Sequence, residues 1–398
     1  MKSLLIWCIV IGTLGCVLLR PKRIQEAFFA CAGALLLVLS QLVPVHAALE
    51  AVMRGGDVYL FLTGMMLLSE LARREGVFDW LAAGAVRAAR GSPSRLFLLV
   101  YGTGVLVTTF LSNDATAVVL TPAVYAAVKR ARATPLPYLL ICAFVANAAS
   151  FVLPISNPAN LVVFGKEMPP LLQWIKTFAL PSGLAIVITF GVLRFILSRH
   201  LKGELTGAVK AVRLSRAGRC AAWALAMTAG VLLFASARGM DLGLPTCLAA
   251  VAAVLIVAAF DRRVFSDVAR SVSWSVLPLV AGLFVLVQGL HEAGALGHAH
   301  GLLVRTAGWT PESGAMTVAF GVALLSNIMN NLPVGVIAGT ALHMSPISYL
   351  LRQALLLGID LGPNLSVTGS LATLLWLVAL RREGQDISAG AFFRVDCW

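Results

Sequence analysis

The stretch Leu111-Ser112-Asn113-Asp114-Ala115-Thr116 places polar side chains in the middle of an apolar run that extends from residue 95 to residue 130. Its first three residues return in the second half of the chain as Leu325-Ser326-Asn327. A further pair recurs at nearly the same spacing, because Asn147 has a counterpart in Asp360. Two recurrences at one spacing indicate an internal repeat more strongly than either motif alone. The sequence therefore predicts a chain built from two related halves.

The composition around these motifs is typical of a membrane protein. Hydrophobic residues make up 59% of the 398 positions and charged residues 12%, which is about half the charged fraction of a soluble domain. The net charge of +13 comes from short Lys and Arg clusters between apolar runs. These clusters lack the interleaved aromatic side chains of a nucleic-acid-binding domain. We therefore expect an all-α polytopic protein in a lipid bilayer, with no nucleic-acid partner.

Apolar runs long enough to cross a bilayer, which takes about 20 helical residues, divide the chain into segments. We expect membrane segments at 3–19, 25–47, 57–72, 95–130, 137–163, 175–198, 219–237, 243–260, 273–291, 313–343 and 349–380. The segments 95–130 and 313–343 are too long for one crossing and have polar middles. Each is therefore expected to be a re-entrant hairpin, which enters and leaves on one side.

The distribution of positive charge orients these segments. With both hairpins in place, most of the 31 lysines and arginines fall on one side, which the positive-inside rule makes cytoplasmic. The N-terminus is then external. The basic stretch 200–218 separates a first repeat, residues 1–199, from a second, residues 219–398. Because the two begin on opposite sides, the sequence predicts inverted-topology repeats, each with a re-entrant hairpin and a broken transmembrane helix.

Four polar clusters, at 112–116, 147–160, 326–333 and 360–370, lie deep in apolar sequence. Proline breaks helices, and Gly, Asn and Asp accept non-helical backbone angles. Irregular backbone survives at membrane depth only where it lines a cavity or is buried in protein. We therefore expect one central site, although a single polar residue can instead bond two helices together. The candidate substrate- or ion-binding residues are Ser112, Asn113, Asp114, Thr116, Asn147, Ser326, Asn327, Asn330, Asn331, Asp360 and Thr368.

Asp114 and Asp360 are the strongest single candidates. A carboxylate inside a membrane is costly and is a functional hypothesis by default. Either residue could carry a proton or contact substrate; the alternative is that it only caps the N-terminus of a half-helix. Glu70, by contrast, is expected to pair with Arg73 or Arg74 at the cytoplasmic end of its helix.

Metal, cofactor and enzyme signatures are weak. The seven cysteines are scattered without a CxxC pair, so a cysteine trio that binds a metalloid is the less favoured interpretation. His291, His298 and His300 fall in a Gly/Ala-rich stretch that we expect to be an ordinary loop. We find no P-loop, HExxH or GxSxG motif. We therefore expect no catalytic residue, metal or cofactor. The energy for transport would come from an ion gradient or a partner subunit. A passive channel stays an alternative.

The motifs resemble the arsenite efflux permease (ArsB) family of the ion transporter superfamily. The resemblance runs over nearly the whole chain and is strongest in Ser326-Asn-Ile-Met-Asn-Asn-Leu-Pro333 and in Gly358-Ile-Asp-Leu-Gly-Pro363. It implies export of arsenite or antimonite across the inner membrane in exchange for protons, which confers arsenic resistance. It also implies that an ArsA-type ATPase docks on the cytoplasmic face, and a homodimer is compatible with it.

Two stretches depart from this resemblance. Asn147-Ala-Ala-Ser has Asn where enteric arsenical pumps usually have Asp. The superfamily also contains NhaD-type sodium/proton antiporters and divalent-anion/sodium symporters. A sodium/proton antiporter or a sodium-coupled organic-anion transporter is therefore the alternative function. Ile387-Ser-Ala-Gly-Ala-Phe-Phe-Arg394 resembles the lead-in to a last helix, which the second repeat would then lack.

Overall fold

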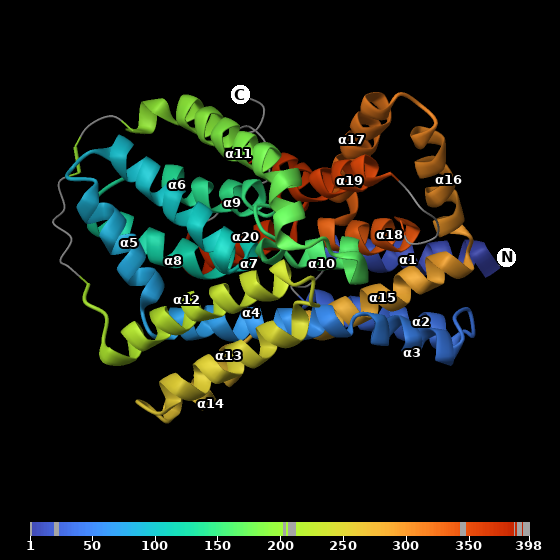
Figure 1. The fold of residues 1–398 in the computed structure, drawn as a ribbon, viewed down its shortest axis with the longest axis horizontal. Helices are drawn as coiled ribbons and strands as arrows, with labels where there is room; N and C mark the ends of the chain where they lie inside the picture. Colours follow the sequence, from blue (N-terminus) through green and yellow to red (C-terminus); the bar gives the residue numbers. More distant parts are fainter. Residues whose placement is uncertain are drawn as a thin grey trace.

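The computed structural model describes residues 2–19, 24–201, 204–205, 212–342, 348–385, 387 and 392. Within these residues all regular structure is helical (Figure 1). The first half contains α1 (Lys2–Leu19), α2 (Glu26–Leu39), α3 (Val45–Arg54), α4 (Gly56–Arg74), α5 (Val77–Ala88), α6 (Pro93–Phe110), α7 (Asn113–Ala115), the π turn η2 (Thr116–Leu120), α8 (Thr121–Arg130), α9 (Leu136–Ala148), η3 (Pro154–Ser156), α10 (Pro158–Phe164), η4 (Gly165–Glu167), α11 (Leu171–Ile196) and η5 (Ser198–Leu201). The second half contains α12 (Arg216–Ala237), α13 (Gly243–Ala258), α14 (Arg263–Ser271), α15 (Val276–Glu292), α16 (Ala295–Ala307), α17 (Pro311–Met329), α18 (Asn331–Leu342), α19 (Tyr349–Leu361), η6 (Gly362–Leu365) and α20 (Leu371–Arg382).

Several of these helices are long and apolar enough to cross a membrane. Five described segments meet that test alone, and α3 with α4 meets it as a pair bent by 47°. The helices at the outside of the molecule expose large apolar side chains, such as Phe195 on α11 and Trp223 on α12. Soluble proteins rarely expose such surfaces over whole helices. The chain is therefore a multi-pass membrane protein with lipid-facing helices, as the composition predicts.

Two expected segments differ from the structure. The run 25–47 is not one crossing, because α2 ends at Leu39 and the chain turns back before α3. Gln41 adopts a left-handed backbone (φ 58°) in that turn, and Pro44, which lacks an N–H, precedes α3. The expected loop after residue 292 instead contains α16, which begins after Gly294 (φ 80°). The loop prediction for His298 and His300 was therefore wrong.

Four helix breaks lie in the polar clusters. The chain leaves α6 at Leu111 and resumes at Asn113, and both α5 and α9 pack against α6 and against α8. The chain therefore folds back on itself there. In the second half α17 ends at Met329 and α18 begins at Asn331, and the two helices are in contact. The other two breaks separate α9 from α10 and α19 from α20.

The halves match closely in one part and less closely in another. Helices α9 and α19 both contain 13 residues, and Asn147 and Asp360 are each the last residue but one. Ser112 lies in the break before α7, whereas its sequence counterpart Ser326 lies inside α17. The second break comes one helical turn later, at Asn330. The repeated Leu-Ser-Asn motif therefore does not mark equivalent backbone positions.

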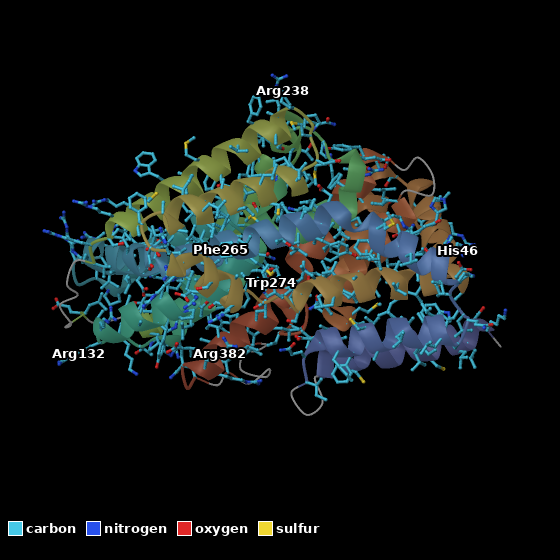
Figure 2. All side chains as sticks on the ribbon, turned by 90° about the horizontal axis from the view of Figure 1, so that it is seen from below. His46, Arg132, Arg238, Phe265, Trp274 and Arg382 are labelled. Atoms are coloured by element: carbon cyan, nitrogen blue, oxygen red, sulfur yellow. The ribbon has the colours of Figure 1, made fainter. Side chains whose placement is uncertain are left out.

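One end of the molecule gathers basic helix ends, at the left of Figure 1. Arg74, at the end of α4, donates to Asp261 (2.8 Å), which precedes α14, and to Asp267 (2.8 Å) within α14. Its hydrogen bond to Asp261 holds the pKa of that carboxyl below its ordinary value. Gln385, after α20, donates to the Tyr125 hydroxyl of α8 (3.4 Å). We call this the basic end; Figure 2 shows Arg132 toward it and His46 toward the opposite end. The cations at 20–23, the residues 202, 203 and 206–211 of the basic stretch, and most of 387–394 lie outside the described residues.

Candidate transport site

A cavity of about 640 Å³ extends from the basic end to the centre of the molecule. At the basic end it is lined by Arg73 on α4 and by Arg382 and Glu383 at the end of α20, all exposed to solvent. At the centre it is lined by Ser112 and Asp114 from the break after α6. Side chains of α4, η2, α8, α15 and α20 form the walls. The cavity therefore connects the basic end with one of the predicted polar clusters.

The break between α6 and α7 presents its polar groups in a fixed arrangement. Ser112 adopts an extended backbone and caps α7, with its Oγ accepting from the Ala115 N–H (3.1 Å). The Asn113 Oδ1 accepts from the Asp114 N–H (2.9 Å). The Thr116 and Thr108 hydroxyls lie 2.8 Å apart and join η2 to α6. The Asp114 side chain is left to line the cavity, whereas Thr116 braces the break.

A second, smaller cavity of about 20 Å³ lies at the centre. Its polar lining comes from Asn113, Asp114, Asn157 and Asn331. These four residues begin or precede α7, α10 and α18, so three separate helix breaks meet here. The volume is sufficient for one water-sized group. Asp114 lines both cavities, as do the apolar residues Leu62, Pro158 and Val276, and it is the only polar side chain among the described residues that the two cavities share.

The breaks of the second half are held by amide side chains. The Asn327 Nδ2 donates to the Gly362 carbonyl (2.7 Å), and its Oδ1 accepts from the Ser366 hydroxyl (2.7 Å). The Thr368 hydroxyl donates to the Asn327 carbonyl (3.2 Å). The Asn330 Nδ2 donates to the Thr368 carbonyl (3.1 Å). These contacts hold η6 and the turn that follows it against α17.

Three side-chain hydrogen bonds join the two halves near the ends of α9 and α19. The Asn147 Nδ2 donates to the Asn364 Oδ1 (3.0 Å) and to the Thr373 hydroxyl (3.4 Å). In the other direction the Asn157 Nδ2 donates to the Asp360 Oδ1 (2.7 Å). Asn147 and Asp360, each near the end of the first segment of a broken helix, therefore contact the break or the second segment of the broken helix in the other half.

The candidate residues divide into two groups. Ser112, Asn113, Asp114 and Asn331 line the two cavities. The others do not line either cavity; they are Thr116, Asn147, Ser326, Asn327, Asn330, Asp360 and Thr368. Ser326 is fully buried, and its hydroxyl has no partner among the described residues.

The sequence did not single out several lining residues. Asn157 lies in the predicted cluster 147–160 but was not among the candidate binding residues. Met65, Asp79 and Arg382 come from helices far apart in the chain, and no local pattern identifies them. The expected pair of Glu70 with Arg73 is present, with the Arg73 Nε donating to the Glu70 Oε2 (2.8 Å).

The charge of the cavities is uneven along their length. Among the described residues that line them, the only cations are Arg73 and Arg382, both at the basic end. The central end offers amides, one hydroxyl and the Asp114 carboxyl. His298 and His300 lie elsewhere and contact the carbonyls of Gly294 (2.8 Å) and Ala341 (3.2 Å). The described residues contain no group of three His, Cys, Asp or Glu side chains placed to hold a metal.

A family model described as "Citrate transporter" matches residues 6–359. The chain belongs to the citrate transporter family. Arsenical pump membrane proteins are among its relatives: one from Escherichia coli is 26% identical over 410 residues, covering 98% of this chain and 94% of the relative. Another, from Yersinia enterocolitica, is 28% identical over 346 residues, covering 83% and 80%. This citrate transporter family member is thus a membrane transporter whose relatives include arsenical pumps.

A solved structure shares the fold. The YdaH transporter of Alcanivorax borkumensis, described as having an unusual topology, aligns with a TM-score of 0.53 at 17% identity. The alignment covers 87% of this chain and 83% of that protein. At this identity the likeness concerns the fold alone. It agrees with the all-helical architecture that the sequence predicts for this citrate transporter family member.

Proposed function

We propose that the chain exports arsenite and antimonite across the inner membrane in exchange for protons. The observation that carries the proposal is the chemistry of the central end of the cavity. That end combines Asn113, Asn157 and Asn331 with the single carboxyl of Asp114, and no cation lines it among the described residues. The relatives named as arsenical pumps support the same substrate.

The substrate is uncharged because it is fully protonated, and an uncharged substrate matches the amide-lined central end of the cavity. Trivalent arsenic and antimony are neutral trihydroxides at neutral pH, so they need hydrogen-bond donors and acceptors but no countercharge. Amide side chains provide both. A carboxylate-rich substrate such as citrate would instead have to lose its hydration beside Asp114 without a compensating cation, which is unfavourable in a low-dielectric site.

The helix breaks support an alternating-access mechanism. We interpret the two halves as inverted repeats, with re-entrant hairpins at α6–α8 and α17–α18 and broken helices at α9–α10 and α19–α20. By the positive-inside rule the basic end is cytoplasmic, so the cavity represents an inward-facing state that receives substrate from the cytoplasm. An ArsA-type ATPase would dock on this end. Substrate would leave as the site turns outward, and the site would return with a proton on one of the two buried carboxyls, Asp114 or Asp360.

The test is arsenite transport in everted membrane vesicles with an imposed proton gradient. Asp114→Asn preserves the size of the side chain but removes the carboxyl at the central end of the cavity, so we expect uptake to fall to the level of vesicles without the protein. Asp241→Asn, an exposed position between α12 and α13, serves as the matched control and should retain transport. Gradient-driven arsenite uptake by Asp114→Asn at the wild-type rate would contradict the assignment.

A sodium-coupled organic-anion transporter is the second candidate. The description of the family model and the two arginines at the basic end favour it. The same vesicles decide between the two: sodium-dependent citrate uptake, with no effect of a proton gradient on arsenite, would replace the arsenite proposal. Proton release driven by sodium alone would indicate a sodium/proton antiporter instead.

A further inference from the structure

We infer that Asn157 is the positioning residue that links the substrate cavity to a separate proton-carrying carboxyl, Asp360, in the other half of the chain. This inference rests on the proposed proton exchange and assigns its coupling group. It divides the two buried carboxyls by role: Asp114 meets substrate, and Asp360 carries the proton.

Asn157 has two different contacts, one for each end of its amide. Its Oδ1 accepts from the Ala159 N–H (3.0 Å), which caps α10. Its Nδ2 donates across the two halves to the Asp360 Oδ1 (2.7 Å). The side chain also lines the small cavity beside Asp114. Asn157 therefore touches both the cavity and Asp360.

Asp360 is closed off from both cavities. It is 1% exposed, lines neither cavity, and its Oδ2 has no hydrogen-bond partner among the described residues. A substrate in either cavity contacts Asp114 and Asn157 but not Asp360. The carboxyl can therefore influence transport only through its neighbours, and Asn157 is the neighbour that reaches the cavity.

The helices that pack against α19 carry few charged residues, and those residues lie far from Asp360. The elements packed against α19 are α9, α10, α17, α18 and η6. Among these, α9, α10, α18 and η6 contain no Asp, Glu, Lys, Arg or His, and α17 contains only Glu312, at its far end. On α19 itself Arg352 lies two turns away and pairs with Glu167. With no nearby cation, a proton is the available way to neutralise Asp360.

The symmetry-related contact contains no ionisable group. At the equivalent position of α9, Asn147 donates to Asn364 and Thr373. The contact through Asn147 therefore consists of amides and a hydroxyl, whereas the contact through Asn157 includes a carboxyl. Of these two contacts only the second can carry a proton, which predicts a single proton through this path in each cycle.

The two contacts of Asn157 can be separated by mutation. A cap requires only an acceptor, as Ser370 demonstrates at the start of α20, where its Oγ accepts from the Thr373 N–H (3.0 Å). Asn157→Ser therefore keeps the cap and removes the donor to Asp360. Asn364→Ser is the matched control, because it removes an amide from the contact with Asn147, which contains no ionisable group.

The experiment measures arsenite transport against pH for the purified full chain in proteoliposomes. Asn157→Ser should shift the pH of half-maximal rate upward by about one unit, since a hydrogen bond to a charged group is worth roughly that much. Asn364→Ser should leave this midpoint in place. Asp360→Asn should lose proton-driven transport while it keeps exchange of arsenite for arsenite. An unshifted midpoint in Asn157→Ser, or proton-driven transport by Asp360→Asn, overturns the inference.

An infrared titration of the same proteins tests the carboxyl without any substrate. We expect a protonated-carboxyl band that is absent in Asp360→Asn and has a raised midpoint in Asn157→Ser. If the wild-type chain shows this behaviour but transports no arsenite, the substrate assignment fails and the inference stands. If arsenite is transported but the band is the same in all variants, the inference fails and the proposed function stands.

Discussion

Asn330 illustrates how a polar side chain can stabilise a helix break. Its backbone lies at φ 75°, ψ 149°, a region that favours glycine. Its Oδ1 accepts from the Leu332 N–H (3.3 Å), and its Nδ2 donates to the Thr368 carbonyl (3.1 Å). The two hydrogen bonds compensate for a strained backbone and join α18 to the chain that precedes α20.

Substitution at Asn330 separates backbone strain from hydrogen bonding. Asn330→Ala keeps the strain and loses both bonds, so we expect a loss of about 2 kcal/mol in unfolding free energy. Asn330→Gly loses the bonds but relieves the strain, which should recover about 1 kcal/mol. Thermal unfolding of the detergent-solubilised variants, followed by tryptophan fluorescence, measures both. Equal stability of the two variants would show that the backbone at this position is unstrained.

The roles of individual polar residues could be predicted only in part. The sequence indicates that Asn327, Asn330 and Thr368 lie in broken helices, and it assigned them to ligand binding. In the structure they donate to backbone groups of the same region, and their part in ligand binding stays a prediction. An amide can satisfy a ligand or a broken helix equally well, and only the three-dimensional position of its partner decides. Asn157 was missed for the same reason, since its partner is in the other half.

Helix α4 forms one wall of the cavity and packs against α13 on another face. Leu62 and Met65 line the cavity. At Gly64 the backbone of α13 comes so close that an added Cβ would lie 2.7 Å from the Thr246 carbonyl oxygen. Such a contact is shorter than van der Waals distance, so the helices could not keep their spacing. Because residue 64 has no side chain, α13 can pack closely against α4 on a face that does not line the cavity.

Gly64→Ala should destabilise the protein, because overpacking a helix contact typically costs about 1–3 kcal/mol. Gly102→Ala is the control: it lies within α6, and an added Cβ there meets nothing within 4 Å. Because Ala has a higher helix propensity than Gly, the unfolding free energy of Gly102→Ala should stay unchanged or rise by up to about 1 kcal/mol. Melting temperatures of both variants, measured in one detergent, provide the comparison. A Gly64→Ala protein as stable as Gly102→Ala would mean that α4 and α13 separate freely.

Element boundaries followed the sequence where Pro, Gly or a polar cap interrupts an apolar run. The starts of α10 and α20, after Asn157 and Ser370, are such cases. The break between α2 and α3 was missed because its polar residues, Ser40 and Gln41, form only a short interruption in an otherwise apolar run. The break at Asn330 lies inside the predicted cluster 326–333, one turn after the Leu-Ser-Asn motif. Packing against α15, which contacts both α2 and α3, decides the first case.

At the scale of the whole molecule, the two ends differ in how they are closed. The cavity reaches the basic end, whereas a separate apolar cluster fills the region between α10, α11, α18 and α19. Its aromatic centre includes Phe164, Trp174 and Phe178, with Trp174 and Phe178 ring centroids 4.5 Å apart. No residue that lines either cavity belongs to this cluster. An outward-facing state of the transporter would therefore have to open it.

The ion pair between Arg352 on α19 and Glu167 in η4 joins the two halves at this closed region. The Arg352 guanidinium also lies over the Phe164 ring, 6.0 Å from its centroid. If alternating access separates the halves here, Arg352→Gln should favour the outward-facing state. A cysteine introduced at the buried Ala338 of the cluster reports this opening through its reaction with a membrane-impermeant maleimide. We expect labelling from outside to accelerate roughly fivefold, the shift that about 1 kcal/mol produces.

The controls for this prediction separate the ion pair from the general charge of the region. Glu312→Gln removes an exposed carboxyl at the start of α17, near Leu351 of α19 through Gly314, and should not change the labelling rate. The double variant Arg352→Glu with Glu167→Arg restores an ion pair and should return the rate toward that of the parent. The parent without the cysteine at residue 338 accounts for the native thiols. If Arg352→Gln and the parent label at one rate, the ion pair does not hold the region closed, and the aromatic cluster alone would have to do so.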